Sequence, residues 1–100
     1  VVRRAKLAMA AGCAGVVCSG LEAEAVRQAL GPDALVVCPG IRPAGAEPMS
    51  ADDQKRIVTP DKAIRNGASH IVVGRPIRTA RDPLTAAHTV VESLAQGLAG

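Results

Sequence analysis

The chain has 100 residues, of which 48% are apolar and 21% are charged, and its formal net charge is +3. This balance is typical of a globular domain, and no apolar run approaches the roughly 18 residues of a membrane helix. The chain has no aromatic residue, and its basic residues are spread along it, so the stacking platforms of nucleic-acid binders are missing. Because no secretory signal pattern is present, we expect a cytoplasmic protein that binds neither membranes nor nucleic acids.

The first half of the chain predicts two strands, each preceded by a helix. A helix over residues 3–11 should end at Gly12, and the apolar run at 15–18 reads as a strand covered on both faces. A second helix should span about 20–30, because Ser19 and Glu22 have the spacing of a capping box and Gly31-Pro32 would stop the helix. A second covered strand is expected at 34–38.

The second half begins with a long irregular stretch, residues 39–58, that is rich in glycine and proline. It leaves the carboxyl end of the second strand, where parallel α/β folds collect ligands, although a surface loop without a function is the alternative. A short helix should run from Thr59-Pro60 to Gly67, followed by a strand at 70–73. This alternation predicts an α/β fold with a parallel sheet.

Asp82-Pro83 should open the last helix, which we expect to continue to about Gln96. Helical spacing predicts that its apolar residues share one face. These residues are Leu84, Ala87, Val90, Val91 and Leu94.

Arginine follows glycine after both the second and the third predicted strands. In Gly74-Arg75, the glycine lets an anion approach the backbone, and the guanidinium can hold two phosphate oxygens. Gly40 and Arg42 repeat this arrangement one strand earlier. A tight turn with a solvated arginine is the alternative for Gly74-Arg75, but two arginines at neighbouring strand ends indicate a shared anion site.

Two further polar groups are candidates for ligand binding. Gln54 could donate its amide to a ligand, with Lys55 or Arg56 adding charge, or this run could be a solvated polar segment. The hydroxyl of Ser19 could cap a helix or bond a substrate, and these roles are compatible.

Cysteine and histidine offer no metal site or nucleophile. Cys13, Cys18 and Cys38 are odd in number and lie in or beside apolar runs, so we expect buried, reduced thiols. His70 and His88 have no nearby serine or cysteine that would suggest a triad, so we expect structural histidines.

Several short motifs follow one another along the chain: Gly15-Val16-Val17-Cys18-Ser19, Cys38-Pro39-Gly40-Ile41-Arg42-Pro43, Asp53-Gln54, Arg56-Ile57, Thr59-Pro60, Val73-Gly74-Arg75-Pro76-Ile77 and Asp82-Pro83. In this order and spacing they resemble the bacterial orotidine 5′-phosphate decarboxylases over nearly all of the chain. The resemblance implies that residues 1–100 form one partial domain. This domain would be the C-terminal three βα units of a (β/α)8 TIM barrel, with strands six to eight.

The resemblance also implies a substrate site. Arg42, Gln54 and Arg75, with the backbone of Gly74, would hold the 5′-phosphate of orotidine 5′-monophosphate or order the loop over it, and Ser19 would meet the pyrimidine. The implied reaction, in pyrimidine biosynthesis, is decarboxylation to uridine 5′-monophosphate without a metal or other cofactor. The implied full-length enzyme is a homodimer.

The family's catalytic set of alternating lysines and aspartates is not found in this sequence. None of Lys6, Lys55 and Lys62 is followed two places later by an aspartate. We therefore expect no catalytic residue here, and we expect the isolated chain to be inactive and poorly soluble. Two alternatives stay open, another phosphate-binding TIM-barrel enzyme and a non-enzymatic phosphate-binding module.

Overall fold

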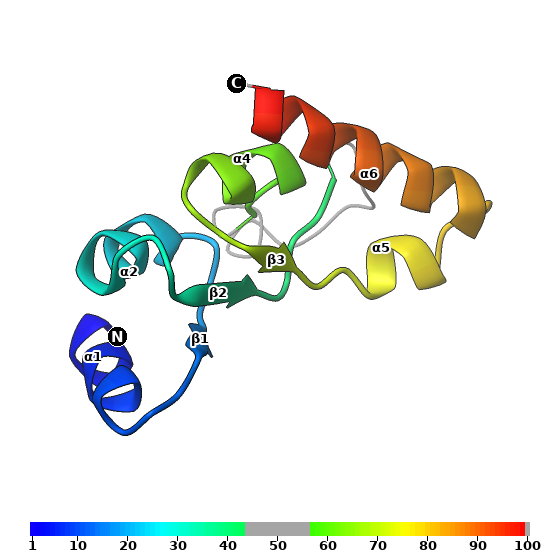
Figure 1. The fold of residues 1–100 in the computed structure, drawn as a ribbon. Helices are drawn as coiled ribbons and strands as arrows, with labels where there is room; N and C mark the ends of the chain where they lie inside the picture. The colour runs from blue at the N-terminus through cyan, green and yellow to red at the C-terminus, as the bar shows by residue number, and fades with distance from the viewer. Residues whose placement is uncertain (44–56, 100) are drawn as a thin grey trace.

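The computed structural model describes residues 1–43 and 57–99. Its helices and strands alternate as the sequence predicts (Figure 1). In chain order they are α1 (Val2–Ala10), β1 (Gly15–Val17), α2 (Ala23–Leu30), β2 (Leu35–Cys38), α4 (Pro60–Arg65), β3 (His70–Ile71), α5 (Arg75–Arg78) and α6 (Pro83–Ala99). The strands form one parallel sheet in the order β1-β2-β3. In Figure 1, α6 lies across α4 near β3, whereas α1 lies at the β1 end.

The two faces of the sheet have different surroundings. In the parallel register, Val16 pairs with Val36 and Cys38 pairs with Ile71. These residues belong to the face that the helices cover, where Val36 and Cys38 are fully buried. The core between this face and the helices also includes Val26 and Ala63.

The opposite face, which we call the open face, consists of Val17, Leu35, Val37, His70 and Val72. Val17 is 70% exposed, Val72 51% and Leu35 44%. No helix or strand of the described ranges covers these side chains. In a closed barrel, side chains from the other strands would fill the space in front of them.

Glycine and proline mark most helix ends where the sequence predicts them. α1 ends just before Gly12, whose φ of 101° lies in the left-handed region that favours glycine. α4 begins after Thr59, with Pro60 in its first turn, and the chain leaves it through Gly67 at a φ of 109°.

The predicted start of the second helix is wrong. α2 begins at Ala23 with Glu22 as its N-cap residue, and this cap makes no side-chain hydrogen bond to the helix. The hydroxyl of Ser19 instead donates to Oε1 of Glu22 over 2.9 Å, and the Glu22 N–H donates to the Ser19 carbonyl over 3.0 Å. Residues 20–22 form a turn in place of the first helical residues. The two side chains of the expected capping box bind each other and not the backbone of the helix.

The C-terminal part differs from the prediction in two ways. The third strand is shorter than expected and is followed by the unpredicted helix α5, whose first turn is held by hydrogen bonds from Ile77 and Arg78 to the Gly74 carbonyl. α6 does begin after Asp82, whose carboxylate accepts hydrogen bonds from the Thr85 backbone and hydroxyl.

The predicted apolar face of α6 is wrong for two residues. Val90 is buried, but Leu84 and Val91 are 69% and 63% exposed. α6 packs on α4 and α5, whereas Leu84, Val91 and Leu98 are seven residues apart and lie on a side that the described elements leave bare.

The expectation of buried thiols is confirmed for Cys18 and Cys38 but wrong for Cys13, which is exposed in the connection between α1 and β1. His70 and His88 are also exposed, so the structure gives them no role in the core of the described residues. None of the helices in the described ranges is long and apolar enough to cross a membrane.

Candidate functional site

Four of the predicted site residues follow the three strands at one edge of the sheet. Ser19 follows β1, Arg42 follows β2, and Gly74 and Arg75 follow β3. Because adjacent parallel strands end at the same edge, the fold gathers these residues at what we call the carboxyl edge. Gln54, the fifth, lies outside the described residues.

The position of Arg42 is fixed by the backbone around it. Its N–H donates to the Val58 carbonyl over 3.2 Å, which joins the segment after β2 to the segment before α4. Ile41, immediately before it, is buried in the core. Nε of Arg42 is itself buried and has no hydrogen-bond partner among the described residues. An unsatisfied buried donor costs about 1–3 kcal/mol, so a ligand that accepts from this group would relieve the penalty.

Arg75 is the first residue of α5 and is exposed. Within the described part of the chain, the only ion pair joins Arg65 to Asp61, so the Arg75 guanidinium has no carboxylate partner there. Apart from Gly74 and its two chain neighbours, no atom of the described residues lies within 4 Å of the place where a Cβ on Gly74 would stand. Among the described residues, the carboxyl edge thus presents a guanidinium without a carboxylate partner beside the backbone of Gly74.

Ser19 is exposed, and its hydroxyl proton is directed to Oε1 of Glu22. The other carboxylate oxygen of Glu22, Oε2, is buried and has no hydrogen-bond partner in the described ranges. The sequence predicts for Glu22 only a place in a helix cap. The three-residue spacing to a serine at a strand end was the signal that could have assigned it to the site.

Two neutral thiols lie at the ends of β1 and β2, on the face that the helices cover. Burial, together with the smaller effect of the neighbouring Cys18, raises the pKa of Cys38 to about 12. Burial also raises the pKa of Cys18. Both side chains therefore belong to the apolar core beneath the carboxyl edge and are poor nucleophiles.

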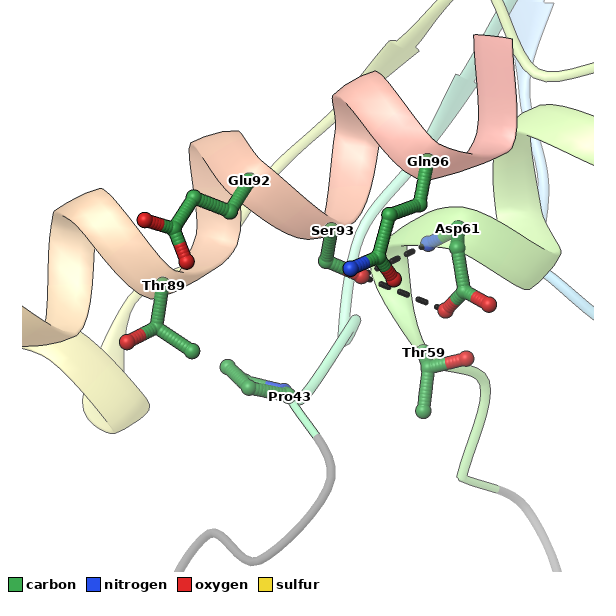
Figure 2. Close-up of a pocket in the computed structure, with 7 residues that line it drawn as sticks. All are labelled: Pro43, Thr59, Asp61, Thr89, Glu92, Ser93 and Gln96. Atoms are coloured by element: carbon green, nitrogen blue, oxygen red, sulfur yellow. Dashed lines mark hydrogen bonds between the residues drawn. The ribbon is translucent and has the colours of Figure 1, made fainter. Parts of the chain in front are cut away.

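The structure also contains a pocket of about 350 Å³ that the sequence analysis did not predict, shown in Figure 2. It lies between α4 and α6. The described residues that line it are Pro43, Thr59, Asp61, Thr89, Glu92, Ser93 and Gln96. Because these seven include two carboxylates and no lysine or arginine, this lining does not suit a phosphate group.

One side of this pocket is a joint between helices. The Asp61 N–H donates to Oγ of Ser93 over 3.1 Å, and this hydroxyl lies 3.2 Å from Oδ1 of Asp61 (Figure 2). Hydrogen bonding from Thr59 lowers the pKa of Asp61, and Ser93 and Arg65 lower it further against the opposing effect of burial. These contacts hold α4 against α6.

Comparison with known proteins places this arrangement in a family. Residues 1–90 match the model of the orotidine 5′-phosphate decarboxylase / HUMPS family. The chain belongs to this family. The family resemblance predicted from the ordered motifs is therefore confirmed.

Curated members of the decarboxylase family are similar along almost the whole chain. The orotidine 5′-phosphate decarboxylase of Methylobacterium sp. (strain 4-46) is 54% identical over 96 residues, which are 96% of this chain and 39% of the relative. The decarboxylase of Trichlorobacter lovleyi is 52% identical over 98 residues, again 39% of its length. The chain thus spans 39% of the length of these curated relatives.

Solved decarboxylase structures share the fold. The crystal structure of the enzyme from Lactobacillus acidophilus matches with a TM-score of 0.76 and 39% sequence identity, over 94% of this chain and 36% of that one. The enzyme from Pyrococcus horikoshii matches with a TM-score of 0.68 at 22% identity, which supports the fold alone. The predicted fold class, the C-terminal three βα units of a (β/α)8 TIM barrel, is confirmed. The open face is the side of this partial barrel that the other strands would line.

Proposed function

We propose that this chain is the C-terminal, phosphate-binding part of an orotidine 5′-phosphate decarboxylase, which converts orotidine 5′-monophosphate to uridine 5′-monophosphate and CO2. The observation that carries the proposal is the arrival of Arg42 and Arg75 at one edge of the sheet from neighbouring strands. Neither guanidinium has a carboxylate partner in the described ranges, and Nε of Arg42 is buried and unsatisfied. A dianion would satisfy both groups.

The phosphate has four proposed contacts. The guanidinium groups of Arg42 and Arg75 bind its oxygens, and the backbone of Gly74 approaches it closely. The amide of Gln54, which lies outside the described residues, completes the grip. Charge-assisted hydrogen bonds of this kind contribute roughly 1.5–3 kcal/mol each.

The remaining candidate, Ser19, meets the pyrimidine ring in this proposal. Its exposure at the end of β1, on the same edge as the two arginines, supports this role. The lysines and aspartates that expel CO2 come from polypeptide outside this chain. Binding energy from the remote phosphate can then stabilise the transition state at the ring.

The full-length enzyme is proposed to be a homodimer, as the family resemblance implies, and to act in the cytoplasm. The open face does not belong to the dimer interface in this proposal. The remaining strands of the same barrel cover it.

A chimera tests the proposal. The 96-residue segment of the Methylobacterium decarboxylase that this chain matches is replaced by this chain. We expect the Methylobacterium chimera to decarboxylate orotidine 5′-monophosphate. Arg75→Ala should lower its kcat/KM by at least about 100-fold, because two charge-assisted hydrogen bonds are lost.

The matched control is Arg78→Ala, which removes an exposed arginine at the other end of α5. Its kcat/KM should stay within about fivefold of the parent, since a screened surface charge contributes little. A folded chimera without decarboxylase activity, or an active one that Arg75→Ala leaves unchanged, would refute the proposal.

A second candidate is another phosphate-binding barrel enzyme, because the matched family description also includes HUMPS. The two candidates differ in the ligand that competes for the carboxyl edge. Stronger competition by uridine 5′-monophosphate than by glycerol phosphate supports the decarboxylase, and the reverse order supports the rival.

A further inference from the structure

Ser19 and Glu22 are joined by two hydrogen bonds at the end of β1. The Ser19 hydroxyl donates to Oε1 of Glu22 over 2.9 Å, and the Glu22 N–H donates to the Ser19 carbonyl over 3.0 Å. The side-chain contact therefore rests on a fixed backbone turn. Ser19 is exposed at the carboxyl edge, whereas Glu22 is half-buried and its Oε2 is fully buried.

The side chain of Glu22 does not cap α2. Although Glu22 is the N-cap residue, its carboxylate makes no hydrogen bond to the first turn of the helix. Its Oε2 has no hydrogen-bond partner in the described ranges, and the contact that the structure gives to its Oε1 is the Ser19 hydroxyl. The half-buried carboxylate of Glu22 thus accepts a hydrogen bond from the exposed hydroxyl of Ser19.

This contact decides which hydrogen bonds Ser19 can make to a ligand. A serine hydroxyl has one proton and two lone pairs, and an ionised carboxylate can only accept. Once the proton points to Glu22, Ser19 can offer the ligand only lone pairs. A ligand atom that meets Ser19 must then be a donor.

We propose that Glu22 is a positioning residue that holds the Ser19 hydroxyl as an acceptor for the ring N–H of the pyrimidine. This inference rests on the proposed function, in which Ser19 meets that ring. The ring presents one N–H among carbonyl oxygens, so an acceptor in this place reads the orientation of the ring. Serine also keeps the negative charge of Glu22 away from a substrate that is itself an anion.

The test measures how the Methylobacterium chimera discriminates between two ligands, uridine 5′-monophosphate and 3-methyluridine 5′-monophosphate, which lacks the ring N–H. Ser19→Ala and Glu22→Ala should each reduce the preference for uridine 5′-monophosphate by about 10-fold, and the double variant should reduce it no further. The residues then act as one unit.

Two further variants separate positioning from structure. Glu22→Gln should restore most of the preference, because its amide oxygen can still accept the hydroxyl proton. Glu24→Ala, an exposed carboxylate in the first turn of the same helix, should leave the preference unchanged.

The outcomes distinguish this inference from the proposed function. Suppose that the chimera decarboxylates its substrate but that Ser19→Ala and Glu22→Ala reduce the ligand preference additively. This result would overturn the role of Glu22 and leave the proposed function standing. The role of Glu22 would also be overturned if Glu22→Ala weakened the binding of both ligands equally while Ser19→Ala weakened only the binding of uridine 5′-monophosphate. A folded chimera without decarboxylase activity would overturn the proposed function and this inference with it.

Discussion

Arg27 donates from Nη2 to the hydroxyl of Ser69 over 2.9 Å, which ties α2 to the residue just before β3. The same guanidinium reaches the carbonyls of Gly67 at 2.9 Å and Ala34 at 2.6 Å. The Ser69 hydroxyl in turn accepts the N–H of Val36 over 3.0 Å. One side chain thus connects a helix and two strand starts at the edge of the sheet opposite the candidate site.

Removing Arg27 should destabilise the fold without changing the site. In the Methylobacterium chimera, we expect Arg27→Ala to lower the free energy of unfolding by about 2–4 kcal/mol, because several part-buried carbonyls lose a charged donor. Urea denaturation measures this change. The neighbouring exposed residue gives the control, Gln28→Ala, which should change stability by less than about 0.5 kcal/mol. Equal stability of the two variants would contradict the role of Arg27.

Gly20 should not tolerate a side chain. A Cβ at this position would lie 2.8 Å from Cβ of Val58, whose carbonyl accepts the Arg42 N–H. We expect Gly20→Ala to cost about 1–3 kcal/mol of unfolding free energy, as overpacking does. It should also weaken phosphate binding through Arg42.

The double variant Gly20→Ala/Val58→Gly checks the cause. It should recover the phosphate affinity, because glycine lacks the Cβ that the new methyl group would meet at 2.8 Å and the two methyl groups beyond it. If affinity stays low in the double variant, the clash with Val58 is not the reason.

The cysteines should differ in reactivity and make stability depend on pH. Cys13 should react with a thiol reagent in the folded chimera, whereas Cys18 and Cys38 should react only after unfolding.

The pKa of Cys38 is raised from 9.0 to about 12. Its contribution to stability is therefore complete below pH 9 and is lost as the pH rises toward about 12.

Denaturation across this alkaline range, compared between the parent chimera and Cys38→Ala, checks the direction in which stability changes with pH. The variant should lose less stability than the parent as the pH rises. A parent whose stability rises in the same range would contradict the assignment.

Ser93 should contribute to the stability of the fold and not to phosphate binding. Ser93→Ala removes the hydroxyl that bonds both the N–H and the carboxylate of Asp61, and we expect a loss of about 1–2 kcal/mol. The affinity of the Methylobacterium chimera for phosphate ligands should stay unchanged, because the described lining of the pocket between α4 and α6 includes two carboxylates and no lysine or arginine. A matched drop in affinity would mean that this pocket belongs to the ligand site.

Local signals made most of the fold predictable. Gly12, Pro60 and Asp82 act within one turn of the chain, by a left-handed φ, a fixed φ and a side-chain cap, so their effects can be read without neighbours. The gathering of Ser19, Arg42 and Arg75 followed from the geometry of parallel strands. That much of the candidate site needs only strand order.

The rest depends on partners that are distant in the sequence. The donors of Arg27 meet acceptors 40 and 42 residues away, which no spacing rule reveals. The exposure of Leu84 and Val91 depends on which helices stand next to α6, and the apolar pattern of one helix does not contain that information. Ser19 and Glu22 have the right spacing for a cap, but they bind each other.

The open face bears on how a barrel of this kind could arise or be divided. Side chains as apolar as Val17 and Val72 face water whenever this third of the barrel stands alone, and β1 and β3 each keep an unpaired edge. The proposed contacts with the nucleotide follow these strands, and their outer edges and open face would be covered when the sheet closes into a ring. Affinity for the nucleotide and completion of the barrel should therefore be gained or lost as a single event.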